Sequence, residues 1–325
     1  MQMCPNGSRS AAGGTRVPSS PEAMAESAAE AVAAGATDLH VHPRTPCGRE
    51  TLSPRVPART LEAIRARLPE PVAVGVTTGA WAEPDPAARL ERVRSRADLS
   101  EPPDHASVNW HGPGAEEVAA ALMDPGIGVE AGLWSGADGT ARFAASPLAP
   151  GAARAPAEVT DPDAASAERS AYALLSELDL VHGPPVLLHG EEGGAWPVLR
   201  RAGRLGLATR IGLEDTLFLP DGRAAESDAQ PVAEAARIHG RARRGHGTAP
   251  GRTDRGSHRT ARGRRLRAAD GAPRAGVGGP TVTGRKPVAP PLSPTDSWAR
   301  RNAPEKRRSS PDVDAARHRR SPDRP

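Results

Sequence analysis

The first 238 residues alternate between short strand-like segments and amphipathic helices, and this alternation constrains the fold more than any other feature. Short apolar runs are typical of buried strands, whereas longer segments with apolar residues three or four positions apart are typical of helices. We expect strands at Gln2–Gly7, Thr37–His42, Pro71–Thr78, His105–Trp110, Ile127–Trp134, Ala153–Thr160, Pro185–His189 and Thr209–Leu213. We expect helices at Pro21–Ala34, Thr60–Leu68, Asp85–Ala97, Gly114–Met123, Ala137–Ala145, Asp163–Leu180, Ala195–Leu205 and Ala229–Ile238.

Eight strands that are each followed by a helix are what a closed (β/α)8 barrel requires. The sequence therefore predicts a TIM barrel over residues 1–238. A doubly wound sheet is the alternative, but it needs a glycine-rich phosphate-binding turn after an early strand, and the sequence contains none. The sixth strand is the weakest of the set, because Pro156 lacks the N–H group that a central strand donates.

Charge is divided unequally along the chain. Residues 239–325 contain 22 basic and 7 acidic side chains, a net charge of +15, whereas residues 1–238 carry −11. The basic part is rich in Arg, Pro and Gly, so it lacks the apolar surface that would offset the entropy cost of ordering. We therefore predict a barrel domain at 1–238, with its last helix incomplete, and a disordered basic C-terminal tail at 239–325.

Three interpretations of this tail stay open. A shifted reading frame explains its composition, because frame errors in GC-rich genes give sequences rich in Arg, Pro, Gly and Ala. An ordinary linker or tail is the second interpretation. Nucleic-acid binding through the basic side chains is the third and the least favoured, since Trp298 is the only aromatic residue in the tail.

Residue counts exclude several kinds of chemistry. The only lysines are Lys286 and Lys306, so residues 1–238 offer no amine for a Schiff base and no P-loop lysine. Two cysteines, Cys4 and Cys47, are too few for a disulfide framework or a four-thiolate zinc site. No apolar run reaches the length of a membrane span and no signal peptide is visible, so we expect a cytoplasmic protein.

His40 and His42 form an H-x-H pair at the end of the second expected strand. Residues i and i+2 of a strand point to the same face, so both imidazoles converge on one side. The C-terminal ends of barrel strands carry the active site in TIM barrels, and paired imidazoles suit Zn²⁺ or another divalent cation. The pair predicts a metal site, with a structural pair of hydrogen-bonded histidines as the alternative.

Glu214 and Asp215 stand at the end of the eighth expected strand, and Arg210 lies four residues before Glu214, on the same face. Strand ends from distant positions meet around the mouth of a barrel, so Glu214 is placed to complete a site with His40 and His42. Asp215 would then be a free base, and Arg210 would orient Asp215 or bind a substrate carboxylate. The alternative is a helix N-cap at Asp215 and a structural ion pair.

Hydroxyl and amide side chains follow other expected strands toward the same mouth. Thr77 and Thr78 end the third strand, Asn109 ends the fourth, and His189–Glu191 follow the seventh. These groups are candidates for binding substrate oxygens. For the two threonines, the alternative is that their hydroxyls satisfy backbone groups at the strand end.

Together these segments resemble the β-keto acid cleavage enzymes, a family typified by 3-keto-5-aminohexanoate cleavage enzyme. Similar segments occur in the same order over residues 1–238. They are Asn6–Gly7, Leu39–Arg44 (LHVHPR), Gly48–Leu52 (GRETL), Gly75–Trp81 (GVTTGAW), Ala106–Trp110 (ASVNW), Gly128–Trp134 (GVEAGLW), Pro185–Glu191 (PVLLHGE) and Thr209–Leu217 (TRIGLEDTL).

The resemblance implies a (β/α)8 barrel with one zinc ion bound by His40, His42 and Glu214. It also implies a reaction in which a β-keto acid and acetyl-CoA give acetoacetate and a new acyl-CoA. Zinc would polarise the β-keto oxygen, which makes carbon–carbon cleavage possible without a lysine imine.

The same resemblance implies roles for further residues. Asp215 would be the catalytic base, held by Arg210. Thr77 and Asn109 would lie near the carboxylate and keto oxygens of the substrate. Members of the family generally form homo-oligomers, so a homo-oligomer is expected here.

Two features depart from the family pattern. An acidic residue that some members carry after the first strand is replaced here by Arg9 or a neighbour, which bears on the substrate side chain. The resemblance ends near Ile238, before the closing segment of the barrel. At about 25 cal/mol per Å² of apolar surface, an uncovered barrel face would cost many kcal/mol. An inactive truncated homologue whose basic tail binds nucleic acid is therefore one alternative.

A second alternative is a metal hydrolase of the amidohydrolase type, which also uses an H-x-H pair on a barrel strand. That class requires the pair on the first strand, further histidines on the middle strands and usually a bridging lysine. The expected strands Ile127–Trp134 and Ala153–Thr160 contain no histidine, which favours β-keto acid cleavage.

Overall fold

Parallel strands and helices alternate along the residues that the structure describes, which are 1–9, 17–178 and 183–246. The structure is a computed structural model. Its strands are β1 (Gln2–Met3), β2 (Asp38–Val41), β3 (Ala73–Thr77), β4 (His105–Asn109), β5 (Gly128–Trp134), β6 (Ala155–Val159), β7 (Val186–Gly190) and β8 (Arg210–Ile211). Its helices are α1 (Pro21–Ala33), α2 (Arg55–Arg67), α3 (Pro86–Arg94), α4 (Ala115–Met123), α5 (Gly139–Ala145), α6 (Ala164–Leu178), α7 (Ala195–Leu205) and α8 (Ala229–His246), with 3-10 helices η1 (Ala149–Gly151) and η2 (Glu192–Gly194).

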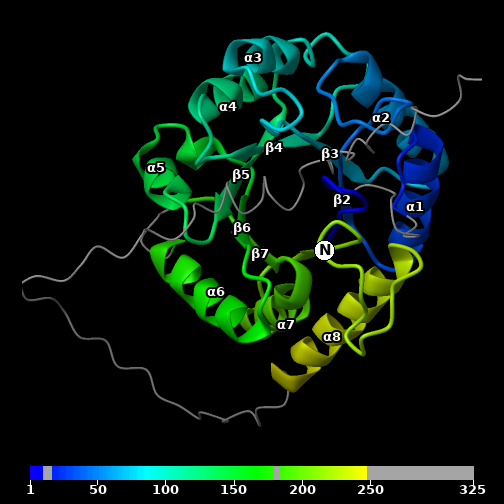
Figure 1. Cartoon of the computed structure of the whole chain (residues 1–325), viewed down its shortest axis with the longest axis vertical. Coiled ribbons are helices and arrows are strands. Elements are labelled where there is room, and N and C mark those ends of the chain that lie inside the picture. Colours follow the sequence, from blue (N-terminus) through cyan, green and yellow to red (C-terminus); the bar gives the residue numbers. More distant parts are fainter. Residues whose placement is uncertain (10–16, 179–182, 247–325) are drawn as a thin grey trace, which may run out of the picture. The chain divides into compact units, whose positions relative to one another are not determined.

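The strands form a barrel. They pair in the order β7-β6-β5-β4-β3-β2-β1-β8, and every pairing between named strands is parallel. A parallel bridge between Leu187 and Ala208 joins the two ends of this order, and the amide of Leu188 donates to the carbonyl of Ala208 at 2.9 Å. The helices follow one another around the strands (Figure 1). The predicted (β/α)8 TIM barrel is therefore confirmed.

Several element boundaries differ from the expectation. β1 ends at Met3 and β8 at Ile211, so the two strands that flank each other near the closure contain two residues each. Helix α2 begins at Arg55, five residues earlier than expected, and Pro57 lies in its first turn, where proline is tolerated. The expected end of the sixth helix at Leu180 lies outside the described residues.

Pro156 is accommodated in β6 by a gap in the sheet. The β5–β6 pairing consists of an isolated bridge from Glu130 to Arg154 and then resumes only at Leu133 and Ala157. Pro156 lies within this gap while it pairs in register with β7. Its missing N–H therefore removes no rung of the β5–β6 ladder, which is why the strand forms despite the proline.

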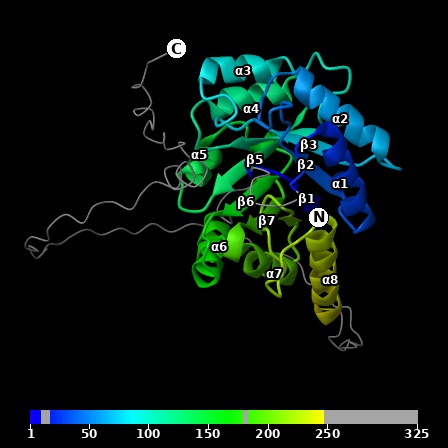
Figure 2. The ribbon, with the colours of Figure 1, turned by 45° about the vertical axis from the view of Figure 1, so that its right-hand side comes forward.

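Helix α8 is longer than expected. The sequence predicts an incomplete last helix that ends at Ile238, but α8 continues to His246 and packs against α7 and α1 (Figure 2). Arginine is a strong helix former, so the basic residues after His239 extend the helix rather than begin the tail. Val232 and Ala235 of α8 are fully buried and cover the barrel. The remainder of the predicted tail, 247–325, lies outside the described residues.

Two helices begin at the caps that the sequence signals. The Ser20 hydroxyl accepts from the amide of Ala23 at the start of α1, and Asp85 accepts from the amide of Ala87 at the start of α3. Proline occupies the first position of both helices, where its missing N–H costs nothing.

The apolar core lies between the strands and the surrounding helices. Alternate strand residues that face the helices are fully buried and apolar, and they include Leu39, Val41, Val74, Val76, Val129, Ala131 and Leu133. Buried apolar residues of the helices, such as Met24, Leu61, Leu122 and Leu199, belong to the same cluster. Because this core lies outside the ring of strands, the inward faces of the strands are left for polar side chains. Among the described residues, no helix combines the length and the apolar character that crossing a membrane requires.

Candidate metal centre

The inward face of β2 is polar. Asp38, His40 and His42 follow one another at intervals of two residues, which places them on one face. Asp38 contacts Arg154, just before β6, at 2.7 Å. Since β2 and β6 are not neighbours in the sheet, this contact crosses the inside of the barrel. His42 therefore lies at the C-terminal end of an inward-facing row.

His42 is held on three sides. Its Nε2 lies 3.7 Å from Oε1 of Glu214, and its Nδ1 lies 2.7 Å from Oε2 of Glu50. The side-chain amide of Asn6 bonds to the backbone N and O of His42, at 3.0 and 2.8 Å. Two ligands of a tetrahedral zinc ion lie roughly 3.4 Å apart. The separation of Nε2 from the Glu214 oxygen therefore suits a shared ion.

His40 lies two residues before His42 and points to the same face. Its Nδ1 is 3.4 Å from Oε2 of Glu130, and the centroids of the two imidazole rings are 5.3 Å apart. Because Nδ1 faces Glu130, Nε2 is the nitrogen left to serve as a ligand. Nδ1 of each histidine thus faces a carboxylate, but it is hydrogen-bonded in His42, whereas in His40 it has no hydrogen-bond partner among the described residues.

The charges around these rings favour a cation. Burial lowers the pKa of His40, and the Glu130 carboxylate offsets only part of that effect. Burial opposes protonation of His42 as well, but the Glu50 and Glu214 carboxylates raise its pKa above the usual value. Burial alone would raise the pKa of Glu214, yet Arg210, followed by the two histidines, lowers it to about 2. An ionised carboxylate therefore lies beside the imidazoles.

Arg210 binds both carboxylates at the end of β8. Its Nη2 lies 2.8 Å from Oε1 of Glu214 and 3.0 Å from Oδ1 of Asp215, and its Nε donates to the same Asp215 oxygen at 3.1 Å. Arg210 therefore contacts both carboxylates, as expected from the sequence, but the alternation of side chains along a strand is not what brings them together. A turn closed by the bond from Asp215 N to Gly212 O brings the carboxylates back to Arg210. Asp215 caps no helix, since α8 begins at Ala229.

A second group of potential ligands lies deeper in the barrel. One ligand atom each of His40, His105 and Glu130 lies within 4.8 Å of the others, and no other group of three or more meets this limit in the described part of the chain. His105 lies 3.1 Å from Glu130 and 3.1 Å from Asp38, and Arg154 contacts the same two carboxylates.

This deeper group is also part of an ion-pair network. Burial opposes protonation of His105, but Glu130 and Asp38 raise its pKa to about 9. Asp38 and Glu130 therefore lie beside two positively charged groups, His105 and Arg154, and a divalent ion bound by His40, His105 and Glu130 would compete with this pairing.

The predicted set of His40, His42 and Glu214 has the donor chemistry that a divalent ion needs. Glu214 Oε2 is buried and has no hydrogen-bond partner among the described residues. A buried, ionised oxygen without a donor is costly, and a cation would satisfy it. Imidazole and carboxylate ligands in this combination suit Zn²⁺. Ligand atoms of His40, His42 and Glu214 do not all lie within 4.8 Å of one another: His42 faces Glu214, whereas His40 faces Glu130.

The predicted substrate-binding residues lie at the ends of β3 and β4. The Thr77 hydroxyl accepts from the amide of Gly79 at 3.0 Å, and the Thr78 hydroxyl donates to the carbonyl of Ser107 at 2.6 Å. Both threonines therefore have the backbone role that was the alternative for them. Asn109 is half-buried, and its amide oxygen lies against Gly132, where an added Cβ would approach it to 2.5 Å.

Other titratable groups lie near Asp215. His189 places Nδ1 3.6 Å from Oδ1 of Asp215 and Nε2 3.7 Å from Oε2 of Glu158. Burial and the charge of Arg210 lower the pKa of His189 to about 4, so it is neutral at pH 7. Burial and the nearby Glu191 raise the pKa of Glu158 well above its usual value. Glu158 was missed from the sequence, although it pairs in register with His189 and shares its inward face.

Arg9 reaches the same region from the loop after β1. Its Nε donates to the carbonyl of Glu214 at 2.8 Å, and its Nη2 pairs with Glu192 at 2.6 Å. Glu192 has a φ of 50°, a left-handed conformation that is uncommon for a residue with a side chain. A cation therefore lies beside the turn that carries Glu214 and Asp215.

Three further residues that contact the histidines were not singled out from the sequence. Glu50 and Trp81 lie in loops, where no periodicity indicates which side chains return to the site. Glu130 lies on β5, two residues before Gly132, and alternation would have placed it on the inward face.

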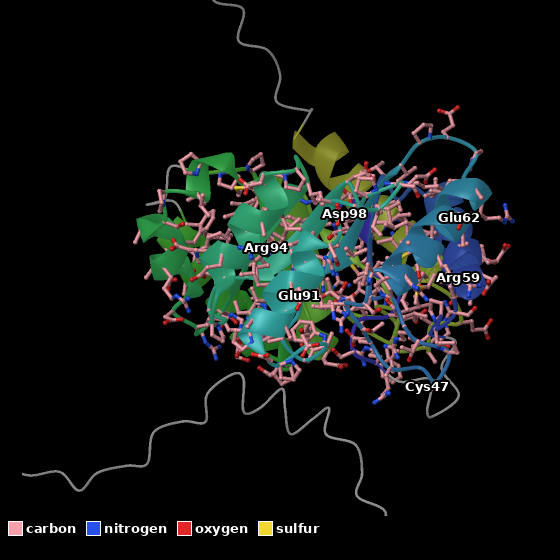
Figure 3. All side chains as sticks on the ribbon, turned by 90° about the horizontal axis from the view of Figure 1, so that it is seen from above. Cys47, Arg59, Glu62, Glu91, Arg94 and Asp98 are labelled. Carbon is pink, nitrogen blue, oxygen red and sulfur yellow. The ribbon has the colours of Figure 1, made fainter. Side chains whose placement is uncertain are left out.

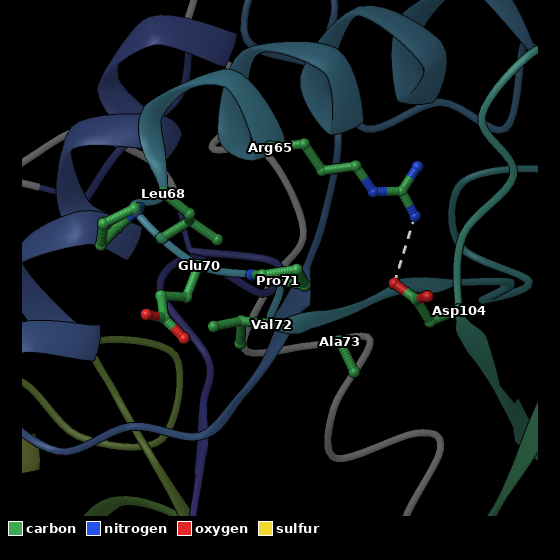
Figure 4. A pocket seen from close by; sticks show the side chains of 8 residues that line it. Arg65, Leu68, Glu70, Pro71, Val72, Ala73 and Asp104 are labelled. Carbon is green, nitrogen blue, oxygen red and sulfur yellow. Dashed lines mark hydrogen bonds and ion pairs between the residues drawn. The ribbon is translucent and has the colours of Figure 1, made fainter.

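The described cavity lies away from these groups. It has a volume of about 410 Å³ and is found at the N-terminal ends of β3 and β4 (Figure 4). Arg65 lies across it at 3.1 Å from Asp104, and both charges are thereby paired. The candidate metal centre is at the opposite, C-terminal end of the strands, so this cavity is not part of it.

Solved structures confirm the barrel. The chain aligns with a ternary complex of ObcA with a C4-CoA adduct and oxalate at 17% identity and a TM-score of 0.54, covering 70% of this chain and 64% of ObcA. A binary complex of ObcA with oxaloacetate gives 16% identity and a TM-score of 0.52, with coverages of 68% and 63%. Type I 3-dehydroquinate dehydratase from Clostridium difficile gives 11% identity and a TM-score of 0.50, with coverages of 74% and 91%. The chain thus spans less than two thirds of the length of ObcA.

No curated protein matches the chain. The family model of the beta-keto acid cleavage enzymes matches residues 1–119 and 176–249, which is more than half of the sequence. The match extends beyond Ile238, where the resemblance was expected to end, and it includes all of α8. Every predicted site residue lies within the matched ranges. The chain therefore belongs to the β-keto acid cleavage enzyme family.

Proposed function

We propose that this protein is a zinc-dependent enzyme that converts a β-keto acid and acetyl-CoA to acetoacetate and an acyl-CoA. The observation that carries the proposal is the contact of Arg210 with both Glu214 and Asp215, next to His42. Membership of the family supports the reaction class. The oxaloacetate and CoA adduct named for ObcA support a small β-keto acid and a CoA thioester as ligands.

His40, His42 and Glu214 would hold the metal ion. When bound, the ion supplies Lewis acidity, which polarises the β-keto oxygen of the substrate for carbon–carbon cleavage. Arg210 offsets part of the negative charge that Glu214 and Asp215 bring together, and it keeps the Glu214 carboxylate ionised for ligation. The absence of lysine from residues 1–238 agrees with a route that forms no imine.

Asp215 is the proposed base. Arg210 donates twice to Oδ1, whereas Oδ2 is buried and has no hydrogen-bond partner among the described residues. Oδ2 is therefore the atom that would accept a proton from the substrate. Thr77, Thr78 and Asn109 would line the substrate end of the site, where the Asn109 amide would bind a carboxylate or keto oxygen.

The test is an assay of purified enzyme with a β-keto acid and acetyl-CoA, combined with metal analysis. We expect acetoacetate only when both substrates are present, and zinc in the wild type but not in the His40→Ala/His42→Ala double variant. Asp215→Asn should lower kcat by roughly 10²- to 10⁴-fold, the usual contribution of a general base. Asp98→Asn, at an exposed position (Figure 3), is the matched control and should leave kcat unchanged.

A metal hydrolase would behave differently in the same assay. Turnover of an amide or lactone without CoA would favour that class and overturn the proposed reaction. Acetoacetate formation that persists in the double histidine variant would overturn the metal requirement.

We also propose that the barrel domain ends with α8 and that the following segment is a separate tail. The shifted-frame explanation of that tail predicts that another reading frame of the gene encodes an amphipathic helix after this point. Translation of the two other frames tests it, and two frames without such a helix would exclude it. A cytoplasmic homo-oligomer remains our expectation for the enzyme, which light scattering and cell fractionation would test.

A further inference from the structure

We propose that Glu50 and Trp81 are positioning residues that fix the ring of His42 for metal binding. The inference rests on the proposed function, since it concerns a ligand of the proposed metal ion. Neither residue faces the ion itself. Each acts through His42: Glu50 at Nδ1, the nitrogen that does not face Glu214, and Trp81 on the face of the ring.

The two residues contact His42 and each other. Oε2 of Glu50 lies 2.7 Å from Nδ1 of His42, and the indole Nε1 of Trp81 donates to the same oxygen at 2.6 Å. The indole and imidazole rings are stacked, with centroids 6.0 Å apart and planes that differ by 6°. The Glu50 side chain is 10% exposed and that of His42 is 4% exposed. The ring is therefore held both at its edge and on its face.

These contacts decide which nitrogen is offered to a ligand. With Nδ1–H donated to the Glu50 carboxylate, the lone pair of the neutral ring lies on Nε2, the atom that faces Glu214 at 3.7 Å. A carboxylate on the outer nitrogen also increases the basicity of the ligating nitrogen. The second bond, from Trp81, keeps the carboxylate from rotating away from the ring.

The local sequence builds this arrangement in two loops. An antiparallel bridge between Arg44 and Glu50 folds the loop after β2 back on itself, and this returns Glu50 to His42. In the loop after β3, an added Cβ at Gly79 would lie 2.2 Å from the Trp81 ring, so the indole can occupy its position only beside glycine. The segments GRETL and TTGAW therefore both contribute a side chain that holds the ring of His42, although they are far apart in the sequence.

The Glu130 carboxylate, which lies beside His40, has more partners than the Glu50 carboxylate beside His42. Glu130 also accepts from Gln2 and contacts Arg154 and His105, so its charge is shared among several donors. The contacts of Glu50 are fewer, and His42 and Trp81 share one of its oxygens. Removal of the Glu50 charge should therefore act on His42 directly, while the barrel network stays intact.

The experiment measures the affinity of the metal-free full-length protein for Zn²⁺ by competition with a chromogenic chelator. Glu50→Gln should weaken Zn²⁺ binding about 10- to 100-fold, the usual effect of losing an outer partner of a metal-bound histidine. Trp81→Phe keeps an aromatic ring on the imidazole but removes the N–H donor, and it should weaken binding about 3- to 10-fold. Glu62→Gln, on the exposed side of α2 (Figure 3), is the matched control and should bind Zn²⁺ as the wild type does.

A second readout separates positioning from folding. The thermal midpoint of each metal-free variant reports the fold, and the visible absorption of the Co²⁺ form reports the ligand geometry. We expect near-wild-type midpoints and a shifted Co²⁺ spectrum for Glu50→Gln. Wild-type affinity and an unchanged Co²⁺ spectrum in Glu50→Gln would overturn the inference while the proposed function stands. A wild-type protein that binds neither Zn²⁺ nor Co²⁺ would overturn both.

Discussion

The side-chain amide of Asn6 pairs with both backbone polar atoms of His42, as donor to its carbonyl oxygen at 2.8 Å and as acceptor from its amide at 3.0 Å. Asn6 is fully buried, so these bonds are shielded from solvent. The loop after β1 thereby fixes the backbone of a candidate ligand just after β2.

Asn6→Ala should destabilise the protein by about 1 to 3 kcal/mol for each buried backbone group left unpaired. Urea denaturation of the metal-free protein measures this loss. Gln230→Ala removes an exposed side chain that accepts one bond, from the amide of Glu226, and should cost less than about 1 kcal/mol. An Asn6→Ala variant as stable as the Gln230 control would contradict the importance of this pairing.

Gly7 leaves the space that Glu214 occupies. A Cβ added at Gly7 would lie 2.4 Å from Cγ of Glu214, and the residue has a φ of +46°. Gly7→Ala should therefore displace Glu214 and weaken Zn²⁺ binding at least tenfold, in a chelator competition assay. Gly222→Ala is the control, because its φ of +85° brings similar backbone strain with no atom within 4 Å. Equal Zn²⁺ affinities in the two variants would show that the clash has no effect on the site.

Cys47 should be the reactive thiol of this chain. It is exposed on the loop after β2 (Figure 3), and hydrogen bonds from Thr45 and Arg49 lower its pKa to about 7. Alkylation by iodoacetamide should therefore rise to half its maximum near pH 7, and Thr45→Val should move this midpoint to higher pH. Cys4 is an internal control, because burial raises its pKa well above the usual value. Mass spectrometry of the peptides gives both rates, and equal labelling of the two cysteines would contradict the prediction.

Asp228 should make stability depend on pH. Burial raises the pKa of Asp228 to about 7, whereas an aspartate in the unfolded chain has a pKa of about 3.9. The folded state therefore holds a proton that the unfolded state releases, so stability is lost as the pH rises from about 4 to about 7.

Asp228→Asn removes this titration and keeps groups that can bond to Leu213 and Ser27. The free energy of unfolding of the wild type should fall relative to that of the variant across this interval, by up to about 1.4 kcal/mol per pH unit. Urea denaturation at pH 5 and pH 8 measures the difference. A constant difference between the two proteins would rule out the raised pKa.

The barrel could be predicted because the same pattern, a short apolar segment followed by an amphipathic helix, recurs along the chain. Each apolar segment from Thr37 to Leu213 marks a strand, and the helix between two strands fixes the parallel direction. The ends of the elements were harder to predict, since tertiary contacts decide them. β8 stops at Ile211 because the chain turns back to Arg210, and the arginines after His239 favour helix locally while their clustered charge suggests disorder.

The candidate site was only partly predictable for a different reason. His40, His42 and Glu214 could be proposed from residue type and place at strand ends. The partners that hold them are set by loop conformation, and a sequence does not show that Glu50 and Trp81 return to one imidazole. Asn6 and Gly7 were noted as a matching dipeptide, but only the structure relates them to His42 and Glu214.

The brevity of β1 and β8 has a consequence for how the molecule holds its shape. These two-residue strands supply few ladder bonds between β2 and β7, and two of the groups that would bind the metal lie on either side of β1, His42 after β2 and Glu214 after β8. An ion shared by these two side chains would cross-link the least-paired sector of the cylinder. Loading with zinc should then slow hydrogen exchange at the amides of Gln2 and Cys4. The bound ion would in that case stabilise the barrel closure in addition to serving the reaction.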